Sequence, residues 1–210
     1  MKFTQKSALA VAGALALLAA TAVPAQAASY VAHLYPMNPT IAPSTTTGEA
    51  HFTEKGGMLT IDIRVKGAPP DMAHWQHFHG FKDGAQAKCP TLADDTNHDG
   101  IIDLIETGKA SGTTMVPFIT HPATMNVPKG TYPTANAKGD YHYHETVPVK
   151  ELQAAFGKAF PGQQLDLSKR VVYIHGVPDS EKLPSTVQSL GPIPAQVTVP
   201  IACGAIERVK

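Results

Sequence analysis

Short segments of strand character, separated by turns rich in glycine and proline, run through most of this 210-residue chain. Residues 59–65 show the pattern most clearly, because apolar side chains alternate with polar ones over the whole segment, as in a half-buried strand. With 18 prolines and 17 glycines, the chain leaves little room for long helices. The pattern predicts an all-β antiparallel sandwich or barrel. Further strands are expected at 30–34, 48–52, 73–78, 141–147, 171–175 and 197–202.

Helical pieces and one long loop interrupt this pattern of strands. Helical pieces are expected in the turn after Gly100 and over 149–160, where apolar residues recur at helical spacing. The stretch 90–133 is expected to be one long loop between strands, and loops of this length are often functional.

The overall composition excludes some classes of function. The chain has 17 lysines and arginines against 17 aspartates and glutamates, with no basic cluster, which argues against a nucleic-acid partner. At 43% hydrophobic and 16% charged residues, it fits neither a disordered nor an integral membrane protein.

The N-terminal segment has the features of an export signal. Lys2 and Lys6 precede an apolar run over 8–20, and small residues stand at Ala25 and Ala27. We expect residues 1–27 to be a cleaved signal peptide and 28–210 to form one secreted or periplasmic domain, with no membrane attachment after cleavage. In an oxidising compartment Cys89 and Cys203 are expected to form a disulfide; two buried free thiols are the alternative.

Ten histidines are the unusual entry in the composition, and three of them lie within six residues. On a strand, His77 and His79 point to one face, so both imidazoles can reach one metal ion such as copper, zinc, nickel or iron. A pair of this spacing also occurs as ordinary exposed strand residues. His175 ends the apolar run 171–175, where a buried histidine needs a partner.

Taken in order, several segments resemble the copper/zinc superoxide dismutase family. Its H-G-F-H-x-H strand, which follows a G-L-x-P-G loop, resembles 74–79 after 67–72, and its first half-cystine follows this strand as Cys89 does. Its V-V-x-H strand with later acids resembles 171–175 with Asp179, its T-A-x-x-x-G turn 134–139, and its A-C-G-V-I segment 202–206. The resemblance implies an eight-stranded Greek-key β-barrel or sandwich with a long metal-loop insertion.

The resemblance also implies a copper site. It assigns His77, His79 and His175 as catalytic copper ligands, with His74 as a supporting residue behind them and the cysteine bridge pinning the metal loop. His121 is the candidate for a fourth copper ligand.

The chain departs from the family at two places. The loop after the first cysteine contains only His98 and His121, so the family's zinc site is expected to be absent. The family's catalytic arginine corresponds to Pro200, which supplies no cation to attract superoxide. Arg64, Arg170 and Arg208 are the available substitutes, and the sequence does not choose among them.

Four other histidines lie among strand residues. His142 and His144 are expected on the sheet that does not carry the copper ligands, either as an exposed pair or as an auxiliary metal-capture site. His33 and His51 are expected to be ordinary half-buried or surface residues.

Residues 95–106 match a twelve-residue calcium loop. Gly100 stands at the sharp turn and Ile102 at the apolar anchor position. The segment before the loop is too short and too proline-bearing for a full EF-hand, so a weak structural calcium site is expected, which would order 90–133; an acidic turn that binds nothing is the alternative. The expected ligands are Asp95, Asn97, Asp99, the Ile101 carbonyl, Asp103 and Glu106.

Three functions follow from these features. The first is an exported copper-dependent superoxide dismutase that cycles between Cu(II) and Cu(I) without zinc. The second is a secreted protein that stores or sequesters copper or another divalent metal, which the proline at the arginine position favours. The third is a structural module in which the metal loop stabilises an interaction surface. Superoxide or metal ions are the expected small ligands, and the sequence does not set the oligomeric state.

Overall fold

The computed structural model describes residues 27–209. The expected signal peptide, 1–27, therefore lies outside the described residues except for its last residue. In the described part of the chain, no helix is both long enough and apolar enough to cross a membrane.

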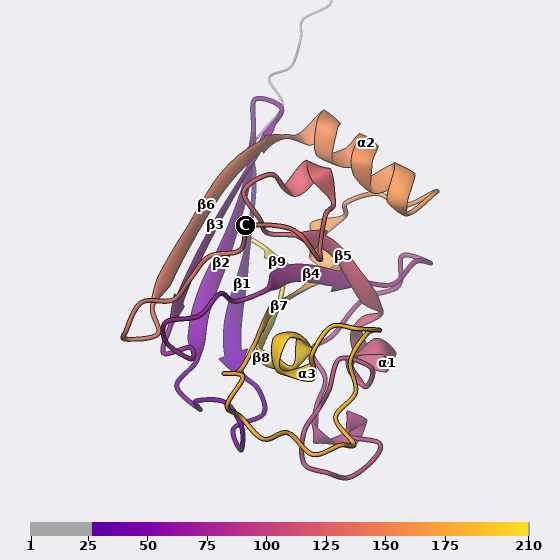
Figure 1. Cartoon of the computed structure of the whole chain (residues 1–210). Coiled ribbons are helices and arrows are strands. Elements are labelled where there is room, and N and C mark those ends of the chain that lie inside the picture. The colour runs from indigo at the N-terminus through magenta and orange to yellow at the C-terminus, as the bar shows by residue number, and fades with distance from the viewer. Residues whose placement is uncertain (1–26, 210) are drawn as a thin grey trace, which may run out of the picture.

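The described residues form a curled antiparallel β-sheet with few helices (Figure 1), which confirms the expected all-β class. Eight strands follow one another in the order β5-β4-β7-β8-β1-β2-β3-β6, and a short ninth strand pairs with β1. The strands are β1 (Ala28–Pro36), β2 (Thr47–Lys55), β3 (Met58–Lys66), β4 (Gln76–Gly80), β5 (Thr113–Pro117), β6 (Tyr141–Pro148), β7 (Val171–His175), β8 (Pro200–Ala205) and β9 (Glu207–Arg208).

The sheet has two halves that share β1. The first part of β1 pairs with β2, whereas Tyr35 and Pro36 at its end pair with β8. The connections from β3 to β4 and from β6 to β7 cross between the halves, as in a Greek-key barrel. Among the described strands, β5 and β6 are not paired with each other, so the barrel is open at this point.

The main core lies inside the curl of the sheet. Leu59, Ile61, Ile63 and Val65 of β3 are each at most 1% exposed, as their alternation predicts, and they pack with Phe52 of β2. Burial of each such side chain stabilises the fold by about 1.5–3 kcal/mol.

The helices lie outside the sheet. α2 (Val149–Ala159) confirms the expected helix and buries Leu152 and Phe156 against the core. The other helical segments are short: α1 (Thr107–Ser111), α3 (Ala195–Thr198), η1 (Leu92–Asp94), η2 (Pro122–Thr124) and η3 (Leu167–Lys169).

Four expected boundaries were wrong. The strand expected at 73–78 begins only at Gln76 and includes His79, because Ala73 pairs with Thr134 in an isolated bridge and joins no strand. The strand expected at 197–202 begins as α3 after Pro194, since local β-propensity yields to tertiary contacts. The helical piece expected in the turn after Gly100 begins only at Thr107. The stretch 90–133 is not a single loop, because it contains β5, a strand of only five residues without polar alternation.

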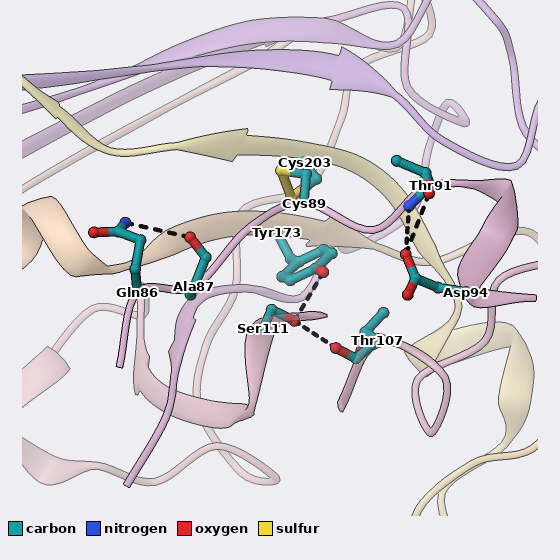
Figure 2. The surroundings of a disulfide bond; sticks show 9 residues. All are labelled: Gln86, Ala87, Cys89, Thr91, Asp94, Thr107, Ser111, Tyr173 and Cys203. Atoms are coloured by element: carbon teal, nitrogen blue, oxygen red, sulfur yellow. Dashed lines mark hydrogen bonds between the residues drawn. A yellow bond between two sulfur atoms is a disulfide. The ribbon is translucent and has the colours of Figure 1, made fainter. Parts of the chain in front are cut away.

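A second, smaller core lies on the outer face of β7 and β8, under the covering loops. It contains Tyr173 of β7 and Ile102 of the loop 95–106, called the acidic loop below. It surrounds the disulfide between Cys89 and Cys203 (Figure 2). This bond confirms the expected pairing, joins residues 114 apart, and ties the loop after β4 to β8. Below it, the Tyr173 hydroxyl lies 3.0 Å from Ser111 Oγ, which anchors α1 to β7.

Replacing both cysteines by alanine is expected to lower the free energy of unfolding by about 4 kcal/mol, because the open chain gains the entropy of a 114-residue loop. Denaturant unfolding of the oxidised protein and the variant measures the difference. Wild-type protein under reducing conditions is the control and should match the variant. If the reduced wild type is still more stable than the variant, the lost stability does not come from the disulfide.

Candidate metal centre

The pairing of β4 with β7 brings three histidines to one face of the sheet. His77 lies opposite Tyr173 in the ladder, and the His175 amide donates a hydrogen bond of 2.8 Å to the Trp75 carbonyl. Since alternate residues of paired strands share a face, His77, His79 and His175 all point away from the main core, as expected for the pair on β4. The loops that cover this face bury them.

The three rings are close together. Their centroids lie 4.5 Å apart for His77 and His175, 4.9 Å for His77 and His79, and 6.1 Å for His79 and His175. One ring nitrogen of each residue lies within 4.8 Å of the other two. Each residue is at most 3% exposed.

Each of these histidines has one buried ring nitrogen without a hydrogen-bond partner among the described residues: His77 Nδ1, His79 Nδ1 and His175 Nε2. His175 Nδ1 donates to the Thr198 carbonyl at 2.6 Å, which leaves the lone pair of Nε2 free. His79 Nε2 lies 3.0 Å from Thr114 Oγ1, which leaves Nδ1 free. A buried polar atom without a partner costs free energy, and a metal ion is a partner that a free ring nitrogen can bind.

Burial keeps these imidazoles neutral. It lowers the pKa of His77 and of His79 well below the usual 6.5, and the neighbouring histidines lower both further. For His175, burial lowers the pKa to about 4, although the hydrogen bond to Thr198 acts in the opposite direction. The neutral imidazole is the form that coordinates metals.

His74 lies behind the cluster and is fully buried. Its Nδ1 lies 3.0 Å from the His175 carbonyl and its Nε2 lies 2.8 Å from the Pro69 carbonyl. A neutral ring donates one of these bonds and a protonated ring both. His74 therefore links the end of β7 to the loop before β4.

A cavity of about 210 Å³ leads to His77 and His175, and its wall is apolar. A second cavity of about 160 Å³ reaches His79 and shares Leu104, Thr114 and Leu190 with the first. None of the described residues that line either cavity is a lysine or an arginine. The first cavity is lined by Trp75, His77, Leu104, Thr114, Val127, His175, Leu190, Ile193 and Thr198.

No arginine among the described residues supplies a positive charge to either cavity. Pro200, at the family's arginine position, pairs with His175. The buried Arg170 donates to the Leu165 and Gln164 carbonyls, at 3.0 and 2.8 Å, so it is a structural residue. Arg64 lies on the outer face of β3, and Arg208 is exposed on β9.

The structure does not bring His121 to the cluster. It is exposed at the start of η2 and lines a separate pocket with residues of β6 and α2. No other described histidine, cysteine or carboxylate joins the three within the same distance. His98 is exposed within the acidic loop and belongs to neither of the two groups of described side chains whose ligand atoms lie within 4.8 Å of one another.

The acidic loop 95–106 is held by its own backbone. Asp95 Oδ2 accepts from the Gly100 amide at 2.9 Å, Asn97 Oδ1 from Asp99, and Asp99 Oδ1 from Ile101. Gly100 has φ +84°, a conformation that glycine adopts without strain. Asp95 is 7% exposed. Its Oδ1 is a buried hydrogen-bond acceptor that has no donor among the described residues.

Glu106 differs from the expected arrangement. Its Oε1 accepts from the Thr96 and Asn97 amides, at 2.7 and 3.2 Å, and its Oε2 accepts from the Asp103 amide at 3.1 Å. The acidic side chains of the loop do not form a group of three with ligand atoms within 4.8 Å, in contrast to the three histidines.

A second loop, which lies between β7 and β8, packs against the acidic loop. The sequence did not indicate this contact. Thr186 Oγ1 donates to Asp99 Oδ2 and the Gln188 amide donates to Asp103 Oδ2, each at 2.6 Å. Leu104 from the first loop and Leu190 from the second then line both cavities. The sequence pointed to such a partner only in that carboxylates at these loop positions need hydrogen-bond donors.

Four further histidines lie on β1, β2 and β6, and the two on β6 are on the half of the sheet that does not carry the cluster, as expected for that pair. His142 and His144 of β6 are exposed beside Asp62 of β3. His33 and His51 are exposed beside Glu49. These carboxylate partners were not foreseen, because strand register sets them.

Together these features define a curled antiparallel β protein with one disulfide and a buried three-histidine centre that can bind a metal ion. No family model matches the sequence, and no curated protein matches it. Among solved structures, a Cu/Zn superoxide dismutase from Brucella abortus is similar, at 20% identity and a TM-score of 0.41, over 85% of this chain and 99% of that one. That protein belongs to the family that the sequence motifs resemble. Likeness at this level carries no argument about chemistry, which rests on the side chains themselves.

The metal-free protein is expected to lose stability as the pH falls below 6.5. The unfolded chain protonates its histidines near pH 6.5, whereas the folded chain keeps His175 neutral down to about pH 4. The lowered pKa thus contributes stability that is complete above pH 6.5 and declines between 6.5 and 4, by about 3 kcal/mol for His175. Denaturant unfolding across this range measures it. The stability of H175Q should decline less steeply with falling pH than that of the wild type. Equal declines in the two proteins would show that His175 does not cause the loss.

Proposed function

We propose that the protein is an exported copper-binding protein whose copper is held by His77, His79 and His175. The observation that carries the proposal is the set of three buried ring nitrogens without hydrogen-bond partners, one on each of these residues. Three neutral imidazoles suit copper, which also ranks highest in affinity among the divalent ions for such a site. When bound, copper would supply one-electron chemistry between Cu(II) and Cu(I).

The chain's own residues prepare this site. The Thr198 carbonyl fixes the ring orientation of His175, and Thr114 contacts His79. Partners of this kind set the tautomer and hold ligands in place before the metal binds. The apolar side chains of Leu104 and Leu190 limit the access of water.

Superoxide dismutation is the second candidate function. It is favoured by the cavity that reaches His77 and His175, which has room for a two-atom ligand. The absence of a cationic side chain among the described residues of its wall removes the attraction that would draw in an anion. We therefore place storage or sequestration of copper before fast dismutation.

Export is part of the same proposal. The disulfide between Cys89 and Cys203 fits an oxidising compartment. The basic residues, apolar run and small residues within 1–27 support a cleaved signal, which would place the domain 28–210 in the periplasm or outside the cell.

The purified protein is expected to bind copper with a spectroscopic signature of nitrogen ligands. The H77Q and H175Q variants should bind copper at the cluster about ten-fold or more weakly, because each lacks a ligand. H121Q is the matched control and should bind like the wild type, since His121 is exposed and lines a separate pocket. Electron paramagnetic resonance of Cu(II) and metal analysis measure this. Unchanged spectra in H77Q and H175Q would overturn the proposal, whereas bound copper without superoxide removal would exclude only the dismutase.

We also propose a structural calcium site in the loop 95–106. Its support is the buried Oδ1 of Asp95, together with the burial of Asp103 and Glu106 in the same loop. Buried carboxylates without a counter-ion are costly, and calcium takes oxygen ligands of this kind. The expected ligands are Asp95, Asn97, Asp99, the Ile101 carbonyl, Asp103 and Glu106, with Glu106 turning from its present amide partners.

Removing calcium with a chelator is expected to increase protease cutting between Pro90 and Pro133, because the loop loses its central cation. An unpaired loop should bind with a dissociation constant of about 10⁻⁴–10⁻³ M, so calcium in the millimolar range should restore protection. D95N should be cut at the same rate with and without calcium. H98N, a change in the same loop at a position that is no ligand, is the control. Equal cutting of the wild type with and without calcium would contradict the site.

A further inference from the structure

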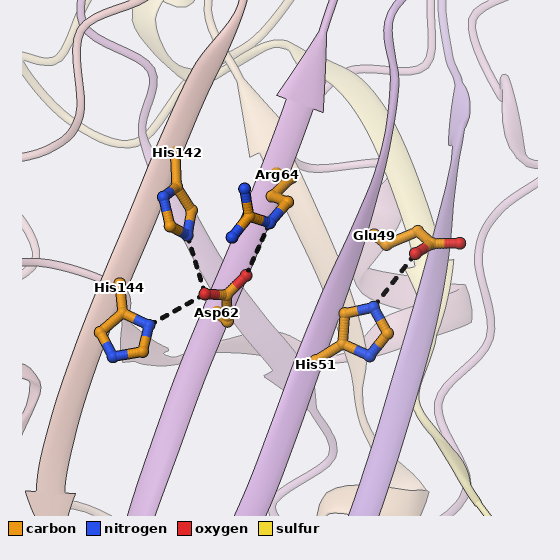
Figure 3. A network of polar contacts seen from close by, with 6 residues as sticks. All are labelled: Glu49, His51, Asp62, Arg64, His142 and His144. Atoms are coloured by element: carbon orange, nitrogen blue, oxygen red, sulfur yellow. Dashed lines mark hydrogen bonds and ion pairs between the residues drawn. The ribbon is translucent and has the colours of Figure 1, made fainter.

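The outward face of β1, β2, β3 and β6 carries an unusual row of side chains (Figure 3). Four of the ten histidines lie on it, and each contacts a carboxylate. They lie on the half of the sheet opposite the buried cluster, so the copper proposal does not use them. The histidines are His33, His51, His142 and His144, and the carboxylates are Glu49 and Asp62.

Three of these side chains converge. His142 and His144 alternate on β6 and share its outer face, and Asp62 lies opposite His144 in the β3–β6 ladder. Asp62 Oδ2 lies 2.8 Å from His142 Nε2 and 2.9 Å from His144 Nδ1. Both rings therefore point at one carboxylate oxygen, and one ligand atom from each of the three residues lies within 4.8 Å of the others.

Arg64 holds the carboxylate in this orientation. Its Nε donates to Asp62 Oδ1 at 3.2 Å, which leaves Oδ2 directed at the two imidazoles. Partial burial raises the pKa of Asp62, but hydrogen bonds from His144 and His142 and the charge of Arg64 outweigh this effect and hold it below its usual value. The carboxylate is thus ionised and positioned at neutral pH.

The neighbouring group on β1 and β2 provides an internal comparison. Glu49 also contacts two histidines, but His33 lies 3.2 Å from Oε1 and His51 lies 3.1 Å from Oε2. Its two rings therefore approach different oxygens, and among the described residues this trio does not form a group within 4.8 Å. The same residue types on the same face converge at Asp62 and diverge at Glu49, so composition alone does not make the site.

We propose that Asp62, His142 and His144 form a second metal site, which binds a divalent transition ion such as Zn²⁺, Cu²⁺ or Ni²⁺ at the protein surface. Two imidazoles and one carboxylate are a donor set that these ions accept, and solvent fills the remaining positions. Ligand bonds of about 2.0–2.1 Å require only small rotations of rings that are 43% and 56% exposed. The site is open, so its ion exchanges freely with the medium.

Zinc titration of the purified chain, followed by the nuclear magnetic resonance signals of the histidine rings, tests the site. Zn²⁺ is diamagnetic, and each ring is observed separately, so the result does not depend on the buried cluster. The signals of His142 and His144 are expected to shift together on binding of one ion. H144Q and D62N should each weaken this binding about ten-fold or more, since each removes a ligand.

The H33Q and H51Q variants are the matched controls, because they remove exposed histidines of the Glu49 group from the same face. Both should leave the zinc affinity of His142 and His144 unchanged. All variants replace exposed or half-buried side chains, and thermal unfolding in the absence of metal checks that each is folded. If the His142 and His144 signals respond to pH but not to Zn²⁺, the group is a set of ion pairs and the proposal is wrong. Zinc shifts that persist in H144Q and D62N would also overturn it.

Discussion

The pairing of β4 with β7 is the interaction on which the candidate centre depends. The two strands are almost a hundred residues apart in the chain, yet their register gives His77, His79 and His175 a common face. The opposite face of the same strands supplies Phe78, Val172 and Ile174 to the main core. A shift of one residue would exchange these two sets and place imidazoles among the apolar side chains. The hydrophobic core therefore holds the register that brings the three histidines together.

Burial of the centre comes from the covering loops, because the sheet leaves this face open. The disulfide fixes one covering segment to β8, and Ile102 anchors the acidic loop beside it. Asn38 adds a polar link, since its side-chain amide donates to the carbonyls of Ile102 and Pro200 and its oxygen accepts from the Ile102 amide. The loops thus create the dry surroundings that lower the histidine pKa values and make the unpartnered nitrogens costly.

Much of this arrangement was predictable from the sequence, for identifiable reasons. Alternation over 59–65 reflects a local property of strands, and the spacing of His77 and His79 defines one face of β4. The contacts that set the chemistry were not predictable, because they join distant residues through register: His142 with Asp62, and Thr186 with Asp99. The position of His121 could not be judged either, since a loop of its length has many possible paths. The sequence also contained no signal for the apolar wall formed by Leu104 and Leu190.

The interlocking of the two loops has a consequence for the order of assembly. The loop that contains Asp99 and the one that contains Thr186 hold each other in place, and each leaves the sheet at a different strand. Pairing of β4 with β7 brings these two loops near each other, so closing the contact between them then costs less entropy than closing it across the open chain. The histidine cluster, by contrast, is complete as soon as β4 and β7 pair. A chain that pairs β4 with β7 before these two loops dock would expose the three histidines to solvent first and enclose them last.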